Sequence, residues 1–283
     1  MKLFVKTLKW PDPEKIIPSE DVYPNRDWTH ECQGVANDNH YWYFTQDRAL
    51  WTISGSSRWF SEIPEELRSL GFNHMGDLDY YGGRLYVPLE GAVPPRILIY
   101  RTEAVGAPVY LSNAKLTHFD NDGNIVDNKY NASWCAINPL NGLLYTSLFD
   151  TDILYVYNVK ISASEELLLE PLGNFKLFDE NGNPLVVSKI QGGVISPNTG
   201  HLYLVSDIKD GGIMGFDMIT GRRAFHKVVD YDPDETPPEE LEGIDIWDQP
   251  SGQIHLVMLD NDVHTDDVYF KHYKVEVGSE EFV

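Results

Sequence analysis

The chain of 283 residues is strongly acidic, because 44 Asp and Glu oppose 22 Lys and Arg and give a formal net charge of −22 at pH 7. Such a charge repels phosphate backbones and anionic lipid surfaces, so we expect neither nucleic acid nor a membrane as partner. The length suits one large domain, and the aromatic content of 12% favours strands, on whose pleated surfaces aromatic rings pack well.

The sequence contains no stretch of about 18 apolar residues that would predict a membrane span. The apolar run at residues 3–5 is too short for the central part of a signal peptide. We therefore expect a soluble, monomeric protein that is cytoplasmic, or secreted if a leader has been removed.

Five related segments follow one another along the chain. They are "CQGVANDNHYWYFTQ" from Cys32, "HMGDLDYYGGRLYVPLEG" from His74, "WCAINPLNGLLYTS" from Trp134, "QGGVISPNTGHLYLVSD" from Gln191 and "EGIDIWDQPSGQIHLVMLD" from Glu242. Each has the pattern of a short apolar strand, a turn rich in Gly, Asn, Asp or Pro, and a second strand, and a third strand follows. Three or four antiparallel strands in each of several repeats are typical of a β-propeller.

Two segments between the repeats are predicted hairpins. They are "KLTHFDNDGNI" and "NFKLFDENGNP", in which Gly123 and Gly182 supply the positive φ that a tight turn requires. The segment "IPEELRSLG" is predicted to form one or two helical turns on a loop. The remainder of the chain favours strands and turns.

Five repeats predict an all-β, five-bladed β-propeller that forms a single domain over residues 1–283. The expected blades cover residues 31–72, 73–131, 132–188, 189–239 and 240–279. The fifth repeat has no fourth strand of its own, whereas "KLFVKTL" at residues 2–8 has strand character. We therefore expect this N-terminal strand to complete the fifth blade and close the ring, which protects otherwise bare sheet edges.

Several of these phrases resemble a known group of propellers. "SPNTGHLYLVSD" and "NPLNGLLYTS" resemble the repeated strand-turn-strand of the lactonase, gluconolactonase and NHL-type propellers, and "LEGIDIWD" is similar to the Glu-Gly strand start of the gluconolactonase family. The resemblance implies a propeller with a functional axial mouth. It also implies that Glu242 is a metal ligand.

The innermost strand of each propeller blade runs along the central channel, so the residues at the strand starts are expected to converge on one mouth. Polar and aromatic side chains at these starts are His30, Glu31, Gln33, His74, Asp77, Trp134, Gln191, Glu242 and Asp245. A carboxylate buried without a partner costs several kcal/mol, roughly, so each acid must pair, bind a metal or become protonated.

Two interpretations of these acids remain open. In the first, Glu and Gln side chains accept hydrogen bonds from backbone N–H groups of the neighbouring blade and hold the ring together. In the second, Glu31, His74 and Asp77 are catalytic, and Glu31, His74 and Glu242 bind a divalent cation such as calcium, magnesium, manganese or zinc.

The expected ligand-binding residues are Trp134, Gln191, Gln33 and His30. Trp134 is interpreted either as a stacking platform for a sugar or as a core indole. Cys32 and Cys135 fall on the first and third blades, which are not adjacent, so we predict two free thiols.

Two acidic segments lie outside the strand starts. "LDNDVHTDD" at residues 259–267 is interpreted as a solvated loop or a peripheral calcium site, and "YDPDETPPEELEG" as an ordinary loop or a lid. The sequence has no GxSxG, HExxH, P-loop or Rossmann motif, so no nucleotide cofactor is expected.

The sequence favours an enzyme that acts on a small polar molecule at the axial mouth. The expected reaction is that of a hydrolase or lyase on a sugar, lactone or similar metabolite, with a divalent cation as helper. The alternative is a carbohydrate-binding propeller or scaffold without chemistry. The five strand starts differ from one another, which favours one asymmetric site over five equivalent pockets.

Overall fold

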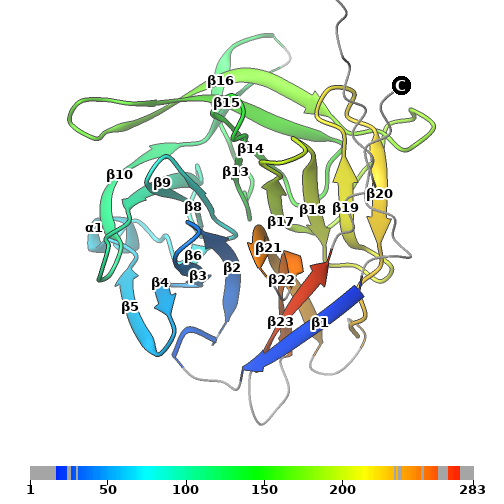
Figure 1. Ribbon diagram of the computed structural model, residues 1–283. Coiled ribbons are helices and arrows are strands. Elements are labelled where there is room, and N and C mark those ends of the chain that lie inside the picture. Colours follow the sequence, from blue (N-terminus) through cyan, green and yellow to red (C-terminus); the bar gives the residue numbers. More distant parts are fainter. Residues whose placement is uncertain are drawn as a thin grey trace, which may run out of the picture.

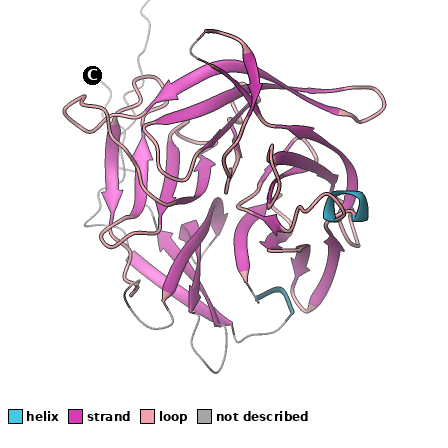
Figure 2. Ribbon diagram, turned by 180° about the vertical axis from the view of Figure 1, so that it is seen from behind, coloured by secondary structure: helices cyan, strands magenta, loops and turns pink. Residues whose placement is uncertain are grey.

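Five antiparallel sheets surround a central axis in the computed structural model, which describes residues 17–23, 27–29, 31–120, 122–232, 234, 238–249, 252–260 and 267–274 (Figure 1). Each sheet is one blade, with its first strand near the axis and its last strand at the periphery. The predicted all-β, five-bladed propeller is therefore confirmed. Figure 2 shows how little helix accompanies the strands.

The first two blades follow one another along the chain. Blade 1 contains β2 (Cys32–Asn37), β3 (Trp42–Gln46), β4 (Ala49–Ser54) and β5 (Ser57–Glu62). Blade 2 has a divided inner strand, β6 (His74–Met75) and β7 (Asp79–Tyr81), both paired with β8 (Arg84–Glu90), and continues with β9 (Arg96–Arg101) and β10 (Val109–Lys115). The predicted helical segment forms α1 (Glu65–Arg68), and η2 (Asp27–Thr29) precedes β2.

The next two blades repeat the same order. Blade 3 contains β13 (Ala136–Ile137), β14 (Leu143–Ser147), β15 (Ile153–Ile161) and β16 (Leu167–Lys176). Blade 4 contains β17 (Ile190–Ile195), β18 (Leu202–Ser206), β19 (Gly212–Phe216) and β20 (Arg223–Lys227). A separate hairpin of β11 (Thr117–Phe119) and β12 (Ile125–Asp127) precedes blade 3, and Gly123 has the predicted positive φ, as does Gly182 in the second expected turn.

Blade 5 joins both ends of the described chain. It contains β21 (Glu239–Gln249), β22 (Gly252–Asp260) and β23 (Asp267–Lys274), and its outer strand is β1 (Ile17–Tyr23). β1 pairs with β23 over seven residues in antiparallel register. An N-terminal strand therefore closes the ring as predicted, and it consists of residues 17–23. The expected closing segment at residues 2–8 lies outside the described residues.

The hydrophobic core is divided into five clusters, and each lies between two neighbouring blades. The clusters join blades 1 and 2, 2 and 3, 3 and 4, 4 and 5, and 5 and 1. In the cluster between blades 5 and 1, Cys32 and Val35 pack with Val257 and Phe270. Each blade therefore buries both of its faces, and the ring is closed by side-chain packing as well as by β1.

Two smaller expectations concern single residues and helices. Cys32 and Cys135 are both buried and unbridged, as predicted from their blades. In the described part of the chain, none of the helices has the length and apolar character needed to cross a membrane.

Candidate functional site

The innermost strands crowd one another around the axis. Contacts run in a closed circuit from β2 to β7, β13, β17, β21 and back to β2. A Cβ on Gly34 would lie 2.5 Å from the Cα of Asp77, and a Cβ on Gly243 would lie 2.5 Å from the Cα of Gly34. These approaches are closer than any real Cβ contact, which explains why the repeats place glycine where the blades meet.

Asp77 of blade 2 occupies the middle of the axis and is fully buried. Its Oδ1 accepts a hydrogen bond from the backbone N–H of Val35 in blade 1, at 3.0 Å. Its Oδ2 accepts from Gly193 in blade 4, at 3.0 Å, and from Ile244 in blade 5, at 3.3 Å. One carboxyl group therefore connects its own blade with three others.

The backbone of Asp77 connects it with the remaining blade. Its N–H donates to the carbonyl of Ser133, at 2.8 Å, and its carbonyl accepts from the N–H of Cys135, at 3.1 Å, both in the segment that forms the inner edge of blade 3. Burial raises the pKa of the Asp77 carboxyl well above its usual range, and the three N–H donors lower it in part. These contacts favour the interpretation of Asp77 as a residue that holds the ring together.

The strand-start end of the axis carries a second group of acids. Glu242 is 3% exposed, and its pKa is raised well above the usual range, first by burial and then by the charges of Glu240, Asp207, Asp77 and Glu31. Glu31 itself is exposed and has a positive φ of 48°. The charges of Asp77 and Glu31 therefore both act on Glu242, and a functional role for these three acids stays a prediction.

His74 has different surroundings from those acids. Burial lowers the pKa of its imidazole, and the charge of Asp47 opposes that effect. Within the described residues, no three His, Cys, Asp or Glu side chains form a group that could hold a metal ion. The expected metal ligands Glu31, His74 and Glu242 are therefore not assembled as such a group, and a divalent cation stays a prediction.

The expected ligand-binding residues are dispersed. Trp134 is completely buried, and its Nε1–H donates to Ser147 Oγ at 2.8 Å, so the indole belongs to the core between blades 3 and 4. Gln33 is buried and Gln191 is half-buried. His30 and most of the acidic segment at 259–267 lie outside the described residues.

A cavity of about 170 Å³ lies at the opposite end of the axis, where the innermost strands end. Its lining comes from all five blades and comprises Asn37, Asn39, Asp79, Tyr80, Tyr81, Ile137, Pro139, Val194, Ile195, Pro197, Asp245 and Ile246. Only a space on the axis can be bordered by every blade. We call it the axial pocket.

Two carboxyl groups line the axial pocket from different blades. Asp79 of blade 2 accepts from the N–H of Ile137 at 2.6 Å and from that of Tyr80 at 2.7 Å. Asp245 of blade 5 is 6% exposed and accepts from Asn37 Nδ2, at 2.5 Å, and from the N–H of Ile246, at 2.7 Å. Both carboxyls thus have neutral N–H donors on each oxygen.

The two carboxyls influence each other electrostatically. Burial raises the pKa of Asp79 to about 7, and the donors at Ile137 and Tyr80 oppose that effect. Burial also raises the pKa of Asp245 well above its usual range, and the charge of Asp79 raises it further. Ionisation of one carboxyl therefore increases the cost of ionising the other, and the two titrations are linked.

The sequence places Asp245 among the ionisable groups at the strand starts but assigns it no role, and Asp79 is not among the expected site residues. The repeat alignment contained a signal for Asp79, which stands two residues after Asp77. An extended strand carries alternate side chains to the same face, so Asp79 is expected to face the axis as Asp77 does.

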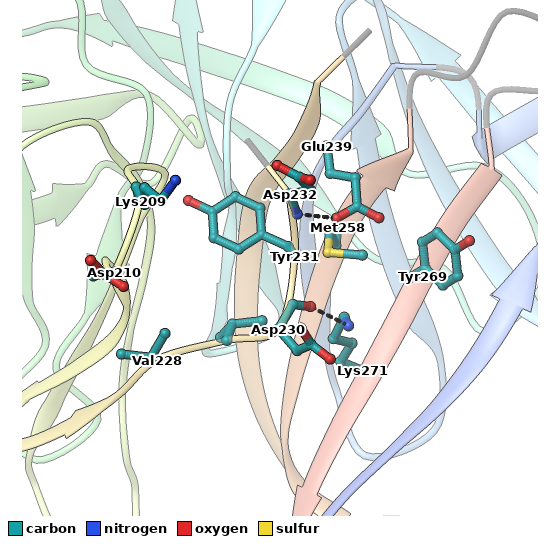
Figure 3. A pocket seen from close by; sticks show the side chains of 11 residues that line it. Lys209, Asp210, Val228, Asp230, Tyr231, Asp232, Glu239, Met258, Tyr269 and Lys271 are labelled. Atoms are coloured by element: carbon teal, nitrogen blue, oxygen red, sulfur yellow. Dashed lines mark hydrogen bonds between the residues drawn. The ribbon is translucent and has the colours of Figure 1, made fainter. Parts of the chain in front are cut away.

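A second and larger cavity, of about 700 Å³, lies between blades 4 and 5 and away from the axis (Figure 3). Its walls carry Asp210, Asp230, Asp232, Glu239 and two lysines, Lys209 and Lys271. Lys271 is 9% exposed, and its Nζ donates to the carbonyl of Asp230 at 2.8 Å. Acidic and basic groups therefore balance each other in part within this cavity.

No family model matches the chain, and no curated protein matches it in sequence. Among solved structures, a luciferin-regenerating enzyme has 14% identity and a TM-score of 0.49, with 94% of this chain and all of that chain covered. The PQQ-bound aldose sugar dehydrogenase of Streptomyces coelicolor has 10% identity and a TM-score of 0.47, with the same coverage. The WD40 β-propeller domain of Doa1 has 7% identity and a TM-score of 0.44, covering 85% of this chain and 78% of that one.

Proposed function

We propose that the protein is an enzyme that acts on a small polar metabolite in the axial pocket. The observation that supports this proposal is the pair of interacting carboxyls, Asp79 and Asp245, in a cavity bordered by all five blades. Raised and mutually dependent pKa values are typical of catalytic acids and bases, because both protonation states are then accessible near neutral pH. The substrate class remains the one expected from the sequence, a sugar, a lactone or a similar metabolite.

The pair provides what hydrolysis of a lactone requires. The ionised carboxyl removes a proton from water as the water oxygen bonds to the lactone carbonyl carbon. The protonated carboxyl then gives its proton to the ring oxygen as the C–O bond breaks, so the lactone and one water become one hydroxy acid. No step is assigned to a metal, because the described side chains do not form a metal-ligand group.

A binding protein without chemistry is the second candidate. Both carboxyls take part in contacts between blades, since Asp79 accepts from Ile137 of blade 3 and Asp245 from Asn37 of blade 1. If these contacts are their whole contribution, the pocket binds a ligand and does not transform it. Replacing each carboxyl by an amide distinguishes the two candidates, because an amide keeps the shape and one of the two hydrogen-bond acceptors but cannot act as a general acid or base.

The experiment measures hydrolysis of δ-gluconolactone and of nitrophenyl glycosides by the wild type, Asp79→Asn and Asp245→Asn. Loss of a general acid or base is expected to lower kcat by about 100-fold to 10,000-fold, while the melting temperature falls only by the effect of the one hydrogen bond that each amide cannot accept. Asp122→Asn, on the exposed β11–β12 turn, is the control. Turnover that survives in both axial variants contradicts the proposal. Ligand-dependent stabilisation without turnover of any of these substrates supports the binding protein.

A further inference from the structure

The axial pocket has two chemically different walls. Blades 3 and 4 contribute Ile137, Pro139, Val194, Ile195 and Pro197, which are all apolar. Blades 1, 2 and 5 contribute all the polar and acidic groups, Asn37, Asn39, Asp79 and Asp245, together with Tyr80, Tyr81 and Ile246. A ligand that fits both walls therefore has an apolar face and a polar face, and the polar face meets two carboxyls.

The acidic wall lacks a counter-charge. Of the described residues that line the pocket, none is Lys, Arg or His. The hydrogen bonds to Asp79 and Asp245 come from backbone N–H groups and from the amide of Asn37, which are all neutral. Neutral donors satisfy the carboxylate oxygens without cancelling their charge, and a second carboxylate nearby increases the cost of ionisation.

The larger cavity between blades 4 and 5 differs from the axial pocket because lysines lie beside its acids. There the buried ammonium of Lys271 contacts the carbonyl of Asp230 (Figure 3). Lys209, which also lines that cavity, pairs with Asp234. The protein supplies its own cations in that cavity. In the axial pocket, none of the described lining residues carries a positive charge. A positively charged group on the ligand would therefore balance the two acids.

We propose that the substrate of the axial pocket is a small amine whose ammonium group binds between Asp79 and Asp245 and whose less polar face packs on Ile137, Val194 and Pro197. This inference rests on the proposed function, since it names the substrate class of the same site. An ammonium needs only a few oxygen acceptors, whereas Ca²⁺ takes six to eight oxygen ligands and Zn²⁺ is usually held by three or four protein ligands. The described side chains do not provide such a group, and half of the wall is apolar.

The size of the pocket limits the amine. A volume of about 170 Å³ is below the range of about 300–1,000 Å³ for pockets that take drug-sized ligands. A ligand of roughly one sugar ring is therefore appropriate. Glucosamine and glucose form a matched pair of probes, because they differ only in an amino group that replaces one hydroxyl.

The experiment is titration calorimetry of both probes at about pH 6.5, where an aliphatic or α-amino group is protonated. We expect glucosamine to bind the wild type at least tenfold more tightly than glucose. Asp79→Asn and Asp245→Asn are expected to bring that ratio close to one, because a bound ammonium favours ionisation of both carboxyls and an amide of the same shape cannot ionise. Glu239→Gln, in the larger cavity, is the control and is expected to leave the ratio unchanged.

Several results would overturn the inference. An ammonium site between Asp79 and Asp245 is excluded if the two probes bind equally or if neither binds. It is also excluded if the ratio falls in Glu239→Gln and not in the axial variants. Displacement of glucosamine by equimolar calcium or magnesium would assign the site to a metal ion instead. Lactone or glycoside turnover that depends on Asp79 and Asp245 would still support the proposed function after such a failure. Selective glucosamine binding without any turnover would support the inference and contradict the enzyme.

Discussion

Asp77 shows how a single side chain can specify the centre of a ring of sheets. Its two oxygens accept three backbone N–H groups, from Val35, Gly193 and Ile244, which belong to three different blades. Neighbouring glycines, Gly34, Gly193 and Gly243, let the innermost strands approach closely enough for the three donors to surround this carboxyl. The acid is retained despite its burial because the donors surround it.

Removing this carboxyl is expected to destabilise the whole molecule. In Asp77→Ala the three N–H groups lose their acceptor, and each buried unsatisfied donor costs about 1–3 kcal/mol. We expect the free energy of unfolding to fall by at least about 3 kcal/mol, measured by urea unfolding followed by tryptophan fluorescence. Asp122→Ala, on an exposed turn, is the control. If the free energy of unfolding falls by less than about 1 kcal/mol, the hydrogen bonds that Asp77 accepts at the axis do not stabilise the fold as proposed.

At the scale of elements, the repeats predicted the five blades because each repeat reproduces the same strand and turn pattern. The functional end of the innermost strands was harder to predict. Register irregularities occur in the inner strands between Cys32 and Gly34, between Ile190 and Gly192, and in β21. Such a bulge changes which side chains face the axis, and its position depends on contacts between blades that the sequence does not display. The bulges of β21 flank Asp245, which the sequence placed among the strand-start acids without a role. Asp79 follows the interruption between β6 and β7 in blade 2, which the sequence did not indicate.

The closing strand was predicted to be N-terminal, yet the segment "IPSEDVY" was not selected as β1. It contains Pro18 and three acidic or hydroxyl side chains, so it lacks the apolar pattern of the other strands. An outer strand is held mainly by its backbone ladder, and here that ladder extends from Ile17 opposite Lys274 to Tyr23 opposite Val268. Edge strands often carry polar residues and proline, which makes them difficult to recognise.

Deletion of residues 1–23 tests the contribution of β1. It removes the partner of β23 and exposes a row of unpaired backbone groups on blade 5, which favours association with other chains. We expect a melting temperature lower by many degrees, or aggregates in size-exclusion chromatography. Deletion of residues 1–8 is the comparison, because it retains every residue of β1. If both deletions melt like the full chain, β1 does not close the ring in solution.

At the scale of the whole molecule, the axis and the blade interfaces hold several buried carboxyls in a protein of charge −22. Burial raises the pKa of Asp79 and of Glu90 to about 7, and raises those of Asp77, Asp207, Glu242 and Asp245. In the unfolded chain these groups ionise near pH 4. The folded state therefore binds more protons than the unfolded state between about pH 4 and pH 7.

Stability is accordingly expected to fall as pH rises through that range. An acid whose pKa is higher in the folded state than in the unfolded state stabilises the fold fully at a pH below its unfolded pKa. This stabilisation is lost as the pH rises from the unfolded to the folded pKa, by about 1.4 kcal/mol per pH unit for each such group. Exposed turn acids such as Asp120 and Asp179 stabilise the fold more as the pH rises, because hydrogen bonds hold their pKa below the usual value. Their stabilisation is lost only below about pH 4, which is outside this window. The most stable pH should therefore lie at the acidic end of the window.

The measurement is the urea midpoint at about pH 5, 6, 7 and 8, which we expect to decrease steadily. Lower pH also reduces the repulsion among surface carboxylates, so a variant must separate the two causes. Glu90→Gln is a neutral mimic of the protonated acid, and its amide can still accept the N–H of Ala132. It should flatten the pH dependence between pH 5 and 7, whereas exposed Glu166→Gln should not. A midpoint that rises with pH, or equal slopes in both variants, would assign the pH dependence to the surface and not to the buried acids.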